Sequence, residues 1–374
     1  LKFLLAKESK MADRSRSPRS ERDCSGIPTS SFVSVVQKQG FLVLDGGVGT
    51  TLQDRGMDVT NPIWAGLALL SDEGRAMNKK VHLDFLLNGS DVVTTNSYKL
   101  SRELLEHLAS ASSLPENLTP ADANEMLKRS VDIANEAVED FMAGDPVGRE
   151  RPLVVGSLGP WGNCNPYTNI EYTGEYESAW LVEKRGGVTV TEDEIADYHF
   201  RRIQAMCSAS RPPDIYGAET MSSVLETKAL VRAFEKAKVH GWICWSCQAP
   251  GVAGTKAPLE DCVAAAASSP WVVALGVNCL RPTFVDEAVA IIKKRWSGEI
   301  VVYPNTGENW DARKDSRRWV GSREMGCFGD HVRAWWHQGV RCIGGCCRIG
   351  PEDINKCRSV LVEVSEEPSR KSKY

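Results

Sequence analysis

Short apolar segments that end in small or polar residues recur along the chain and alternate with segments of helical spacing. The apolar segments span residues 41–45, 91–96, 153–157, 214–220, 242–246, 272–279, 300–304 and 340–343. Continuous apolar runs of this length are typical of parallel strands buried on both faces. The intervening helical segments include residues 125–141, 195–208, 223–238, 283–295 and 329–338. We therefore predict an α/β fold, a single-domain (β/α)8 TIM barrel over residues 35–365, with an open doubly wound sheet as the alternative.

The two ends of the chain differ in composition from this region. Arg14, Arg16, Arg19 and Arg22 alternate with serines and a proline, and such a segment buries too little apolar surface to offset the entropy of ordering. We predict a disordered basic N-terminal tail at residues 1–32 and a C-terminal tail at residues 366–374.

Charge and cysteine content narrow the class of partner. The net charge is −4, which does not favour nucleic acid, and no apolar run approaches the roughly 20 residues of a membrane helix. The 12 cysteines lack the spacing of a small disulfide-stapled scaffold, and a chain of 374 residues needs no such staples. We predict a cytoplasmic protein with free thiols and a few metal ligands, which acts on small molecules and binds neither nucleic acid nor membrane.

Polar residues gather at the carboxyl ends of the predicted strands. Because barrel active sites lie at that end, we expect these residues to share one site. They are Asp45, Thr95, Glu219, Asn278, Cys279, Tyr303, Asn305, Cys346 and Cys347.

Two adjacent cysteines follow the last strand in Gly344-Gly345-Cys346-Cys347. Neighbouring cysteines rarely bridge each other, because the intervening peptide strains the disulfide. Two thiolates directed at one zinc ion are the better interpretation, and Cys279 offers the third ligand of a catalytic site with one open position. The alternative for Cys279 is a buried structural thiol. A non-enzymatic zinc or thiol sensor would use the same three cysteines.

The acids and aromatic residues each allow two interpretations. Asp45 and Glu219 could cap a turn and a helix, or they could converge on the ammonium group of a substrate. The aromatic residues at positions 161–180 could pack their own loop against the barrel, or they could face a sulfonium or quaternary ammonium group.

Seven motifs, in this order, resemble those of the zinc-dependent homocysteine S-methyltransferases over residues 40–365. They are Asp45-Gly46-Gly47-Val48-Gly49-Thr50, Thr94-Thr95-Asn96-Ser97-Tyr98, Gly156-Ser157-Leu158-Gly159-Pro160, Glu219-Thr220, Gly276-Val277-Asn278-Cys279, Tyr303-Pro304-Asn305-Thr306-Gly307-Glu308 and Gly344-Gly345-Cys346-Cys347. The motif at residues 303–308 is similar to the branch that uses S-methylmethionine or S-adenosylmethionine more than to the betaine branch. Residues 163–170 and 177–188 depart from the family pattern.

The resemblance implies a function and its residues. Cys279, Cys346 and Cys347 would hold one Zn²⁺ per chain and serve catalysis, since a zinc-bound thiol is ionised at neutral pH. Asp45, Thr95 and Glu219 would hold homocysteine, and we add Asn278 to this group. We expect the donor near Trp161, Tyr172, Tyr303 and Asn305. The predicted reaction transfers a methyl group from a sulfonium donor to the thiolate of L-homocysteine, giving methionine; a betaine-using homocysteine methyltransferase is the alternative.

Overall fold

The computed structural model describes residues 30–116, 118–166, 168–254, 256–311 and 318–367. Within these residues, eight strands form one parallel sheet in the order β1-β13-β10-β9-β5-β4-β3-β2. The strands are β1 (Leu42–Val43), β2 (Val92–Thr94), β3 (Leu153–Leu158), β4 (Ile215–Met221), β5 (Gly241–Trp245), β9 (Val272–Asn278), β10 (Glu299–Tyr303) and β13 (Cys342–Ile343).

Two aspartates connect the strands at the ends of this order, β1 and β2. The backbone N–H of Asp91 donates to the Val43 carbonyl at 2.7 Å, and the Asp91 carboxylate accepts from the Val43 N–H at 2.9 Å. At the other end of the strands, the Asp45 carboxylate accepts from the Thr94 N–H at 2.7 Å. These bonds close the sheet, and the predicted (β/α)8 barrel is confirmed.

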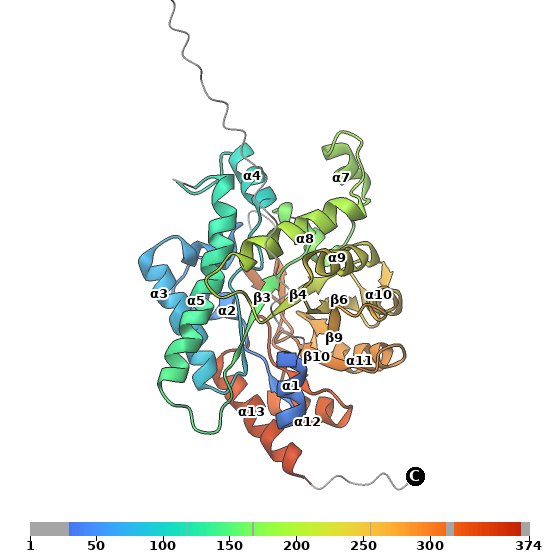
Figure 1. Cartoon of the computed structure of the whole chain (residues 1–374). Helices are drawn as coiled ribbons and strands as arrows, with labels where there is room; N and C mark the ends of the chain where they lie inside the picture. The colour runs from blue at the N-terminus through green and yellow to red at the C-terminus, as the bar shows by residue number, and fades with distance from the viewer. Residues whose placement is uncertain (1–29, 117, 167, 255, 312–317, 368–374) are drawn as a thin grey trace, which may run out of the picture.

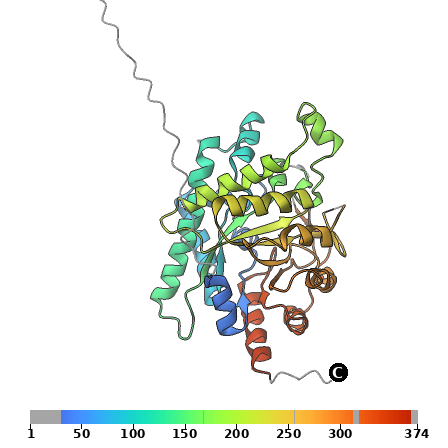
Figure 2. The same ribbon diagram turned by 45° about the vertical axis from the view of Figure 1, so that its right-hand side comes forward.

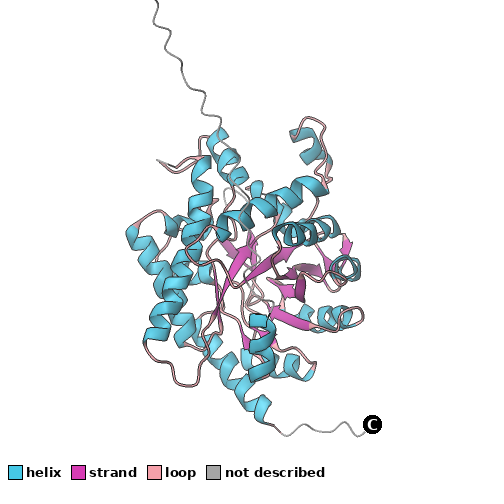
Figure 3. Cartoon of the chain, viewed as in Figure 1, coloured by secondary structure: helices cyan, strands magenta, loops and turns pink. Residues whose placement is uncertain are grey.

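Helices surround the strands (Figures 1 and 3). The longer ones are α1 (Ser30–Gln39), α2 (Val48–Asp54), α3 (Asp72–Leu87), α4 (Arg102–Ser110), α5 (Ala123–Ala143), α8 (Glu192–Cys207), α9 (Val224–Ala237), α10 (Leu259–Ala266), α11 (Val285–Lys293), α12 (Phe328–His337) and α13 (Pro351–Glu366). Side chains at several N-termini satisfy a free backbone N–H, as Ser101 does for Leu104 and Ser223 does for Glu226.

Shorter elements occupy the loops. They are the 3-10 helices η1 (Trp64–Leu69), η2 (Pro120–Asp122), η3 (Trp161–Cys164) and η4 (Pro282–Phe284), the helices α6 (Ile170–Thr173) and α7 (Ala179–Lys184), the hairpin strands β11 (Asn309–Asp311) and β12 (Arg318–Val320), and a small sheet of β6 (Cys247–Ala249), β7 (Val252–Ala253) and β8 (Ala257–Pro258). The α7 segment projects away from the barrel beside α8 and α9 (Figures 1 and 2).

The core has two main parts. One fills the space between the strands and the surrounding helices, and the other fills the barrel interior. Helix α1 covers one end of the interior, where Phe32 packs against Trp242 with ring centroids 5.8 Å apart. Helix α1 therefore lies at the amino ends of the strands and leaves the carboxyl ends open to form a binding site.

The sequence-based boundaries agree closely with these elements. Each predicted strand overlaps an observed strand, and the five predicted helical segments overlap α5, α8, α9, η4 with α11, and α12. Helix α1 begins at Ser30, within the segment for which we expected disorder. Helix α13 likewise extends to Glu366, the first residue of the predicted C-terminal tail. Residues 1–29 and 368–374 lie outside the described residues, so the predicted tails stay predictions over these residues.

Candidate active site

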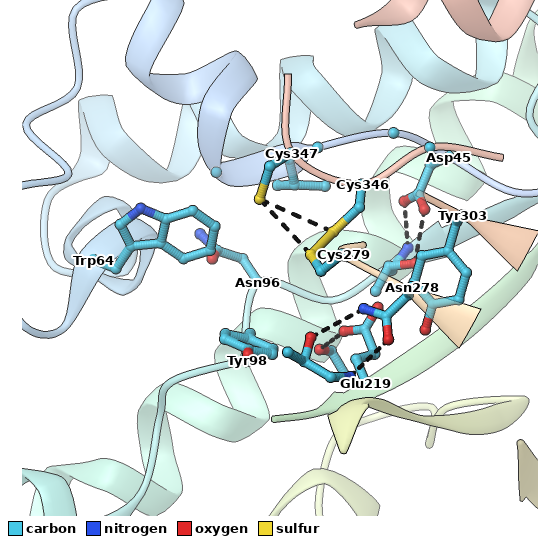
Figure 4. Close-up of a pocket in the computed structure, with 18 of the residues that line it drawn as sticks. Asp45, Trp64, Asn96, Tyr98, Glu219, Asn278, Cys279, Tyr303, Cys346 and Cys347 are labelled. Carbon is cyan, nitrogen blue, oxygen red and sulfur yellow. Dashed lines mark hydrogen bonds between the residues drawn. A yellow bond between two sulfur atoms is a disulfide. The ribbon is translucent and has the colours of Figure 1, made fainter. Parts of the chain in front are cut away.

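A cavity lies at the carboxyl ends of the strands, with an empty volume of about 880 Å³ including its mouth. The end of β4 and the loops after β1, β2, β3, β9, β10 and β13 contribute to its wall. Three cysteines occupy its centre (Figure 4). Trp64 and Asn96 lie on one side of them, Asp45 and Tyr303 lie on the other, and Tyr98 and Glu219 lie below them in the view of Figure 4.

Backbone bonds position the cysteines. The Cys279 N–H donates to the Tyr303 carbonyl at 3.2 Å, and the Cys346 N–H donates to the Pro304 carbonyl at 2.8 Å. Gly47 allows the loop after β1 to approach the cysteine segment, because a Cβ at Gly47 would lie 2.6 Å from the Cys346 carbonyl oxygen. A glycine at position 47 therefore allows the backbone after β1 to pack closely against the cysteine segment.

The donor set fits a metal ion. The sulfurs of Cys279, Cys346 and Cys347 all lie within 4.8 Å of one another, and Cys347 Sγ is 3.9 Å from each of the other two. Two thiolates on a tetrahedral zinc with Zn–S bonds of about 2.3 Å are separated by about 3.8 Å. The spacing from Cys347 to its two neighbours therefore matches a zinc site.

We expected three zinc-binding thiolates, whereas two of these cysteines are joined to each other in the structure. Cys279 and Cys346 form a disulfide, whereas Cys347 is a free thiol (Figure 4). The rule against bridging adjacent cysteines holds, since the bond joins cysteines from different strands. Reduction of this bond would release the three-thiolate set.

Asp45 and Glu219 lie together in the cavity wall. Burial raises the pKa of Asp45 to about 6, although hydrogen bonds from Thr94 lower it. Burial also raises the pKa of Glu219 to about 7; the hydrogen bond from Ser157 opposes this effect and the charge of Asp45 adds to it. Two buried carboxylates whose pKa values are raised by burial are suited to bind a cationic group, which would favour their charged forms.

The cavity is also lined by Thr95 and Asn278, but other residues already engage their side chains. Thr95 Oγ1 accepts from the Ser157 N–H at 2.9 Å and shares a hydrogen bond with Ser97 at 2.7 Å. Asn278 accepts from the Thr220 N–H at 2.7 Å and donates to Thr220 Oγ1 at 3.0 Å. Both side chains therefore hold neighbouring strand ends in place. The two bonds from Asn278 also support Thr220, whose backbone is left-handed with φ of 64°.

The predicted donor residues separate into three locations. Tyr172 lines the cavity. Tyr303 also lines it, but on the side of Asp45 (Figure 4). Trp161 does not line the cavity, because it packs inside its own loop with its ring 5.3 Å from Tyr176. Asn305 does not line it either, since its side chain accepts from the Gly307 N–H at 2.9 Å within the loop. The structure therefore places Trp161 and Asn305 within their own loops, outside the wall of the cavity.

Several lining residues escaped the sequence-based prediction. Trp64 and Tyr98 form an edge-to-face pair with centroids 6.2 Å apart, and Lys99 pairs with Glu171 across the wall. Trp310 and Trp319 of the β11–β12 hairpin also line the cavity. None of these side chains ends a barrel strand, so the strand-end argument could not find them. The sequence offered two weaker signals. Trp64 follows Asn61-Pro62, and Lys99 and Glu171 are the one charged residue in the otherwise uncharged segments 92–101 and 163–174, respectively.

The fold and cavity together define a (β/α)8-barrel protein with a three-cysteine cluster beside buried acids. Residues 42–361 match the family model described as homocysteine S-methyltransferase. Homocysteine S-methyltransferase 1 of Arabidopsis thaliana is 32% identical over 333 residues, which cover 84% of this chain and 92% of the relative. The chain belongs to the homocysteine S-methyltransferase family.

Solved structures agree with this assignment. The homocysteine methyltransferase MmuM from Escherichia coli in its metallated form has a TM-score of 0.71 and 26% identity, covering 87% of this chain and 98% of that one. Its oxidized form has a TM-score of 0.72 and 26% identity, covering 88% and 98%. The predicted family and methyltransferase class are confirmed. Among the described residues, we find no helix with the length and hydropathy that a membrane span requires.

Proposed function

We propose that this protein transfers a methyl group from a sulfonium donor to the thiolate of L-homocysteine, giving methionine, with one Zn²⁺ held by Cys279, Cys346 and Cys347. The observation that carries the proposal is the convergence of these three sulfurs in one cavity with Asp45 and Glu219. We further propose that this reaction takes place in the cytoplasm, where reduced thiols persist.

Zinc would supply a fourth position for the substrate sulfur and would keep that sulfur ionised near neutral pH, where a free thiol is mostly protonated. The three cysteines must be reduced to serve as its ligands, so the Cys279–Cys346 disulfide represents a form that cannot hold zinc through all three sulfurs. The existence of a metallated and an oxidized form of MmuM supports this interpretation.

Asp45 and Glu219 would fix the ammonium group of homocysteine. Their buried carboxylates gain a counter-charge when the ammonium binds, which offsets the cost of keeping them ionised in the cavity wall. Thr95, Ser157 and Asn278 would hold these strand ends in position through the bonds described above. A substrate fixed in this way loses its orientational freedom before the reaction, and alignment of two reactants can lower a barrier by about 7–11 kcal/mol.

The aromatic side of the cavity would receive the methyl donor. Trp64, Tyr98 and Tyr172 line the wall near the sulfurs, and a cation over a desolvated ring gains up to about 2 kcal/mol. The loop after β1 lacks the spacing of a dinucleotide-binding fingerprint. We therefore propose S-methylmethionine as the preferred donor and S-adenosylmethionine as a slower one.

A methyl-donor panel tests the function. The protein is reduced, loaded with zinc and supplied with homocysteine and either S-methylmethionine, S-adenosylmethionine, betaine or methyltetrahydrofolate, and methionine is quantified. We expect the highest kcat/KM with S-methylmethionine. A higher kcat/KM with betaine would overturn the donor assignment, because the aromatic residues suit a quaternary ammonium as well. Zinc binding without methionine formation from any donor would favour the sensor alternative.

A further inference from the structure

A buried ion pair lines the cavity and has no part in the proposed homocysteine site. Lys99 lies in the loop between β2 and α4, and Glu171 lies in α6 after β3. Lys99 Nζ is 3.2 Å from Glu171 Oε1 and 3.1 Å from Oε2. The side chain of Glu171 is 4% exposed and that of Lys99 is 16% exposed.

The pair brings a positive charge to a cavity wall whose other charged residues are acidic. Among the described residues that line the cavity, the charged ones are Asp45, Glu171, Glu219 and Lys99, so Lys99 is the single cation. Lys99 is also the one partner that the described residues give to the Glu171 carboxylate. Both groups therefore retain unused hydrogen-bonding capacity toward the cavity, since an ammonium has three donors and a carboxylate about four acceptor positions.

Stability alone does not account for such a pair. Desolvation of two charges commonly cancels their attraction, and a well-packed apolar pair would be as stable or more stable. A ligand with its own ammonium and carboxylate groups can instead satisfy both charges at once, with its ammonium on Glu171 and its carboxylate on Lys99. Charged hydrogen bonds of this kind are the strong ones in recognition.

The position of the pair assigns it to the donor and not to homocysteine. Glu171 is followed by Tyr172, and Lys99 is preceded by Tyr98, so both charges adjoin the aromatic residues that line the proposed donor side. Tyr98 lies across the sulfur cluster from Asp45 and Tyr303 (Figure 4). Homocysteine would already have Asp45 and Glu219 for its ammonium group.

We propose that Lys99 and Glu171 form a subsite for the amino-acid end of the methyl donor, and that this subsite selects a sulfonium that carries both an ammonium and a carboxylate. The proposal rests on the proposed function for its sulfonium donor. It assigns donor discrimination to two charged residues outside the homocysteine site. S-methylmethionine and S-adenosylmethionine both carry this zwitterion, whereas betaine lacks the primary ammonium.

The test uses three sulfonium donors that differ in these groups. S-methylmethionine carries both charges, dimethylsulfoniopropionate carries the carboxylate alone, and trimethylsulfonium carries neither. For the zinc-loaded protein we measure the ratio of kcat/KM for S-methylmethionine to kcat/KM for each truncated donor, together with the KM for homocysteine. Binding of S-methylmethionine is measured separately by calorimetry on the metal-free, reduced protein.

Glu171→Gln should lower the ratio against dimethylsulfoniopropionate by about tenfold or more, because the ammonium contact is lost. Lys99→Met should lower the ratio against trimethylsulfonium by a similar factor, and Lys99→Arg should restore part of it. Each single variant leaves one buried charge unpaired, which can destabilise the fold. The double variant Lys99→Gln/Glu171→Gln removes both charges and so avoids this cost, and in it both kcat/KM ratios should decrease. Lys128→Met, which removes a salt bridge to Asp132 outside the cavity, is the matched control and should keep the wild-type ratios.

The outcomes separate the two proposals. Unaltered donor ratios and unaltered calorimetric affinity in the folded variants would overturn the subsite. A rise in the KM for homocysteine with unaltered donor ratios would also overturn it and assign the pair to the other substrate. If the wild-type protein methylates homocysteine with none of the sulfonium donors, the proposed function fails, and the calorimetric comparison still decides whether Lys99 and Glu171 bind the zwitterion.

Discussion

The Asp45 carboxylate accepts two hydrogen bonds from Thr94, at 2.7 Å from its N–H and 2.8 Å from its Oγ1, and so links β1 to β2 from within the cavity. The charge of the same carboxylate also raises the pKa of Glu219. Asp45 therefore contributes both to closure of the barrel and to the proposed ammonium site, whereas Glu219 accepts from Ser157 and takes no part in the closure.

This difference predicts distinct effects for two substitutions. Glu219→Gln and Asp45→Asn should each raise the KM for homocysteine about ten- to hundredfold, because a charged hydrogen bond of about 1.5–3 kcal/mol is lost. Both variants should still bind zinc. Asp45→Asn should in addition lower the free energy of unfolding by about 1–3 kcal/mol, since a Thr94 donor loses its acceptor. Denaturant titration and steady-state kinetics check this, and unaltered homocysteine kinetics in both variants would refute the ammonium site.

Ligand binding should depend on pH through the same two acids. With pKa values of about 6 for Asp45 and about 7 for Glu219, most of the charge on Glu219 and about half of the charge on Asp45 are lost as the pH falls from 8 to 6. The product methionine has an ammonium group but no thiol, so its binding reports on the acids alone. We expect methionine to bind about tenfold more weakly at pH 6 than at pH 8, and the effect should shrink in Glu219→Gln. Calorimetry at constant ionic strength measures it, and equal affinity at both pH values would count against the site.

The linked effect on stability has the opposite sign in the unliganded protein. Because both folded-state pKa values lie above their ordinary values, these groups favour the folded state at low pH, and their contribution is lost as the pH rises through about 6 and 7. Because methionine should bind more tightly at pH 8 than at pH 6, it should raise the melting temperature more at pH 8.

Gly49 determines the position of Trp64. A Cβ at Gly49 would lie 2.5–2.9 Å from three atoms of the Trp64 indole, so Gly49→Ala should displace this ring from the cavity wall. Alanine is the better helix former within α2, and a loss of function would thus reflect the displaced indole. We expect a several-fold lower kcat/KM for the sulfonium donor. Gly350→Ala is the matched control, because a Cβ there meets nothing within 4 Å; equal losses in both variants would contradict this role.

Much of this arrangement follows from the sequence. Asp45, Glu219, Asn278, Cys279, Cys346 and Cys347 could be placed in one site, because parallel strands bring their carboxyl ends to one end of a barrel. Lys99, Glu171 and Trp64 could not be placed, because loop conformation follows no periodic pattern.

Trp161 and Tyr303 illustrate the same limit. The Tyr176 hydroxyl and the backbone N–H of Trp161 both donate to the buried carboxylate of Glu226, which holds Trp161 in the core of the loop. Tyr303 ends β10 and contributes to the barrel interior, where Trp242 donates to its hydroxyl at 3.3 Å. The packing partner, and not the residue type, therefore decides where each aromatic side chain lies.

The three cysteines should act as one metal site. Cys279→Ser, Cys346→Ser and Cys347→Ser should each lose zinc and methyl transfer together, measured by elemental analysis and methionine formation on reduced protein. Cys262→Ser, at a buried free cysteine outside the cavity, is the control and should retain both. Oxidation of the wild-type protein before zinc addition should prevent loading, because Cys279 and Cys346 are then joined. Full zinc content and full turnover in any of the three variants would remove that cysteine from the site.

X-ray absorption spectroscopy at the zinc edge, with and without homocysteine, tests the central claim most directly. The reduced, zinc-loaded protein should show three sulfur neighbours at about 2.3 Å and one lighter neighbour. Addition of homocysteine should replace the lighter neighbour with a fourth sulfur, and in Glu219→Gln the same change should require a higher homocysteine concentration. A sulfur count that stays at three with saturating homocysteine, or zinc bound by fewer than three sulfurs beforehand, would contradict the proposed mechanism.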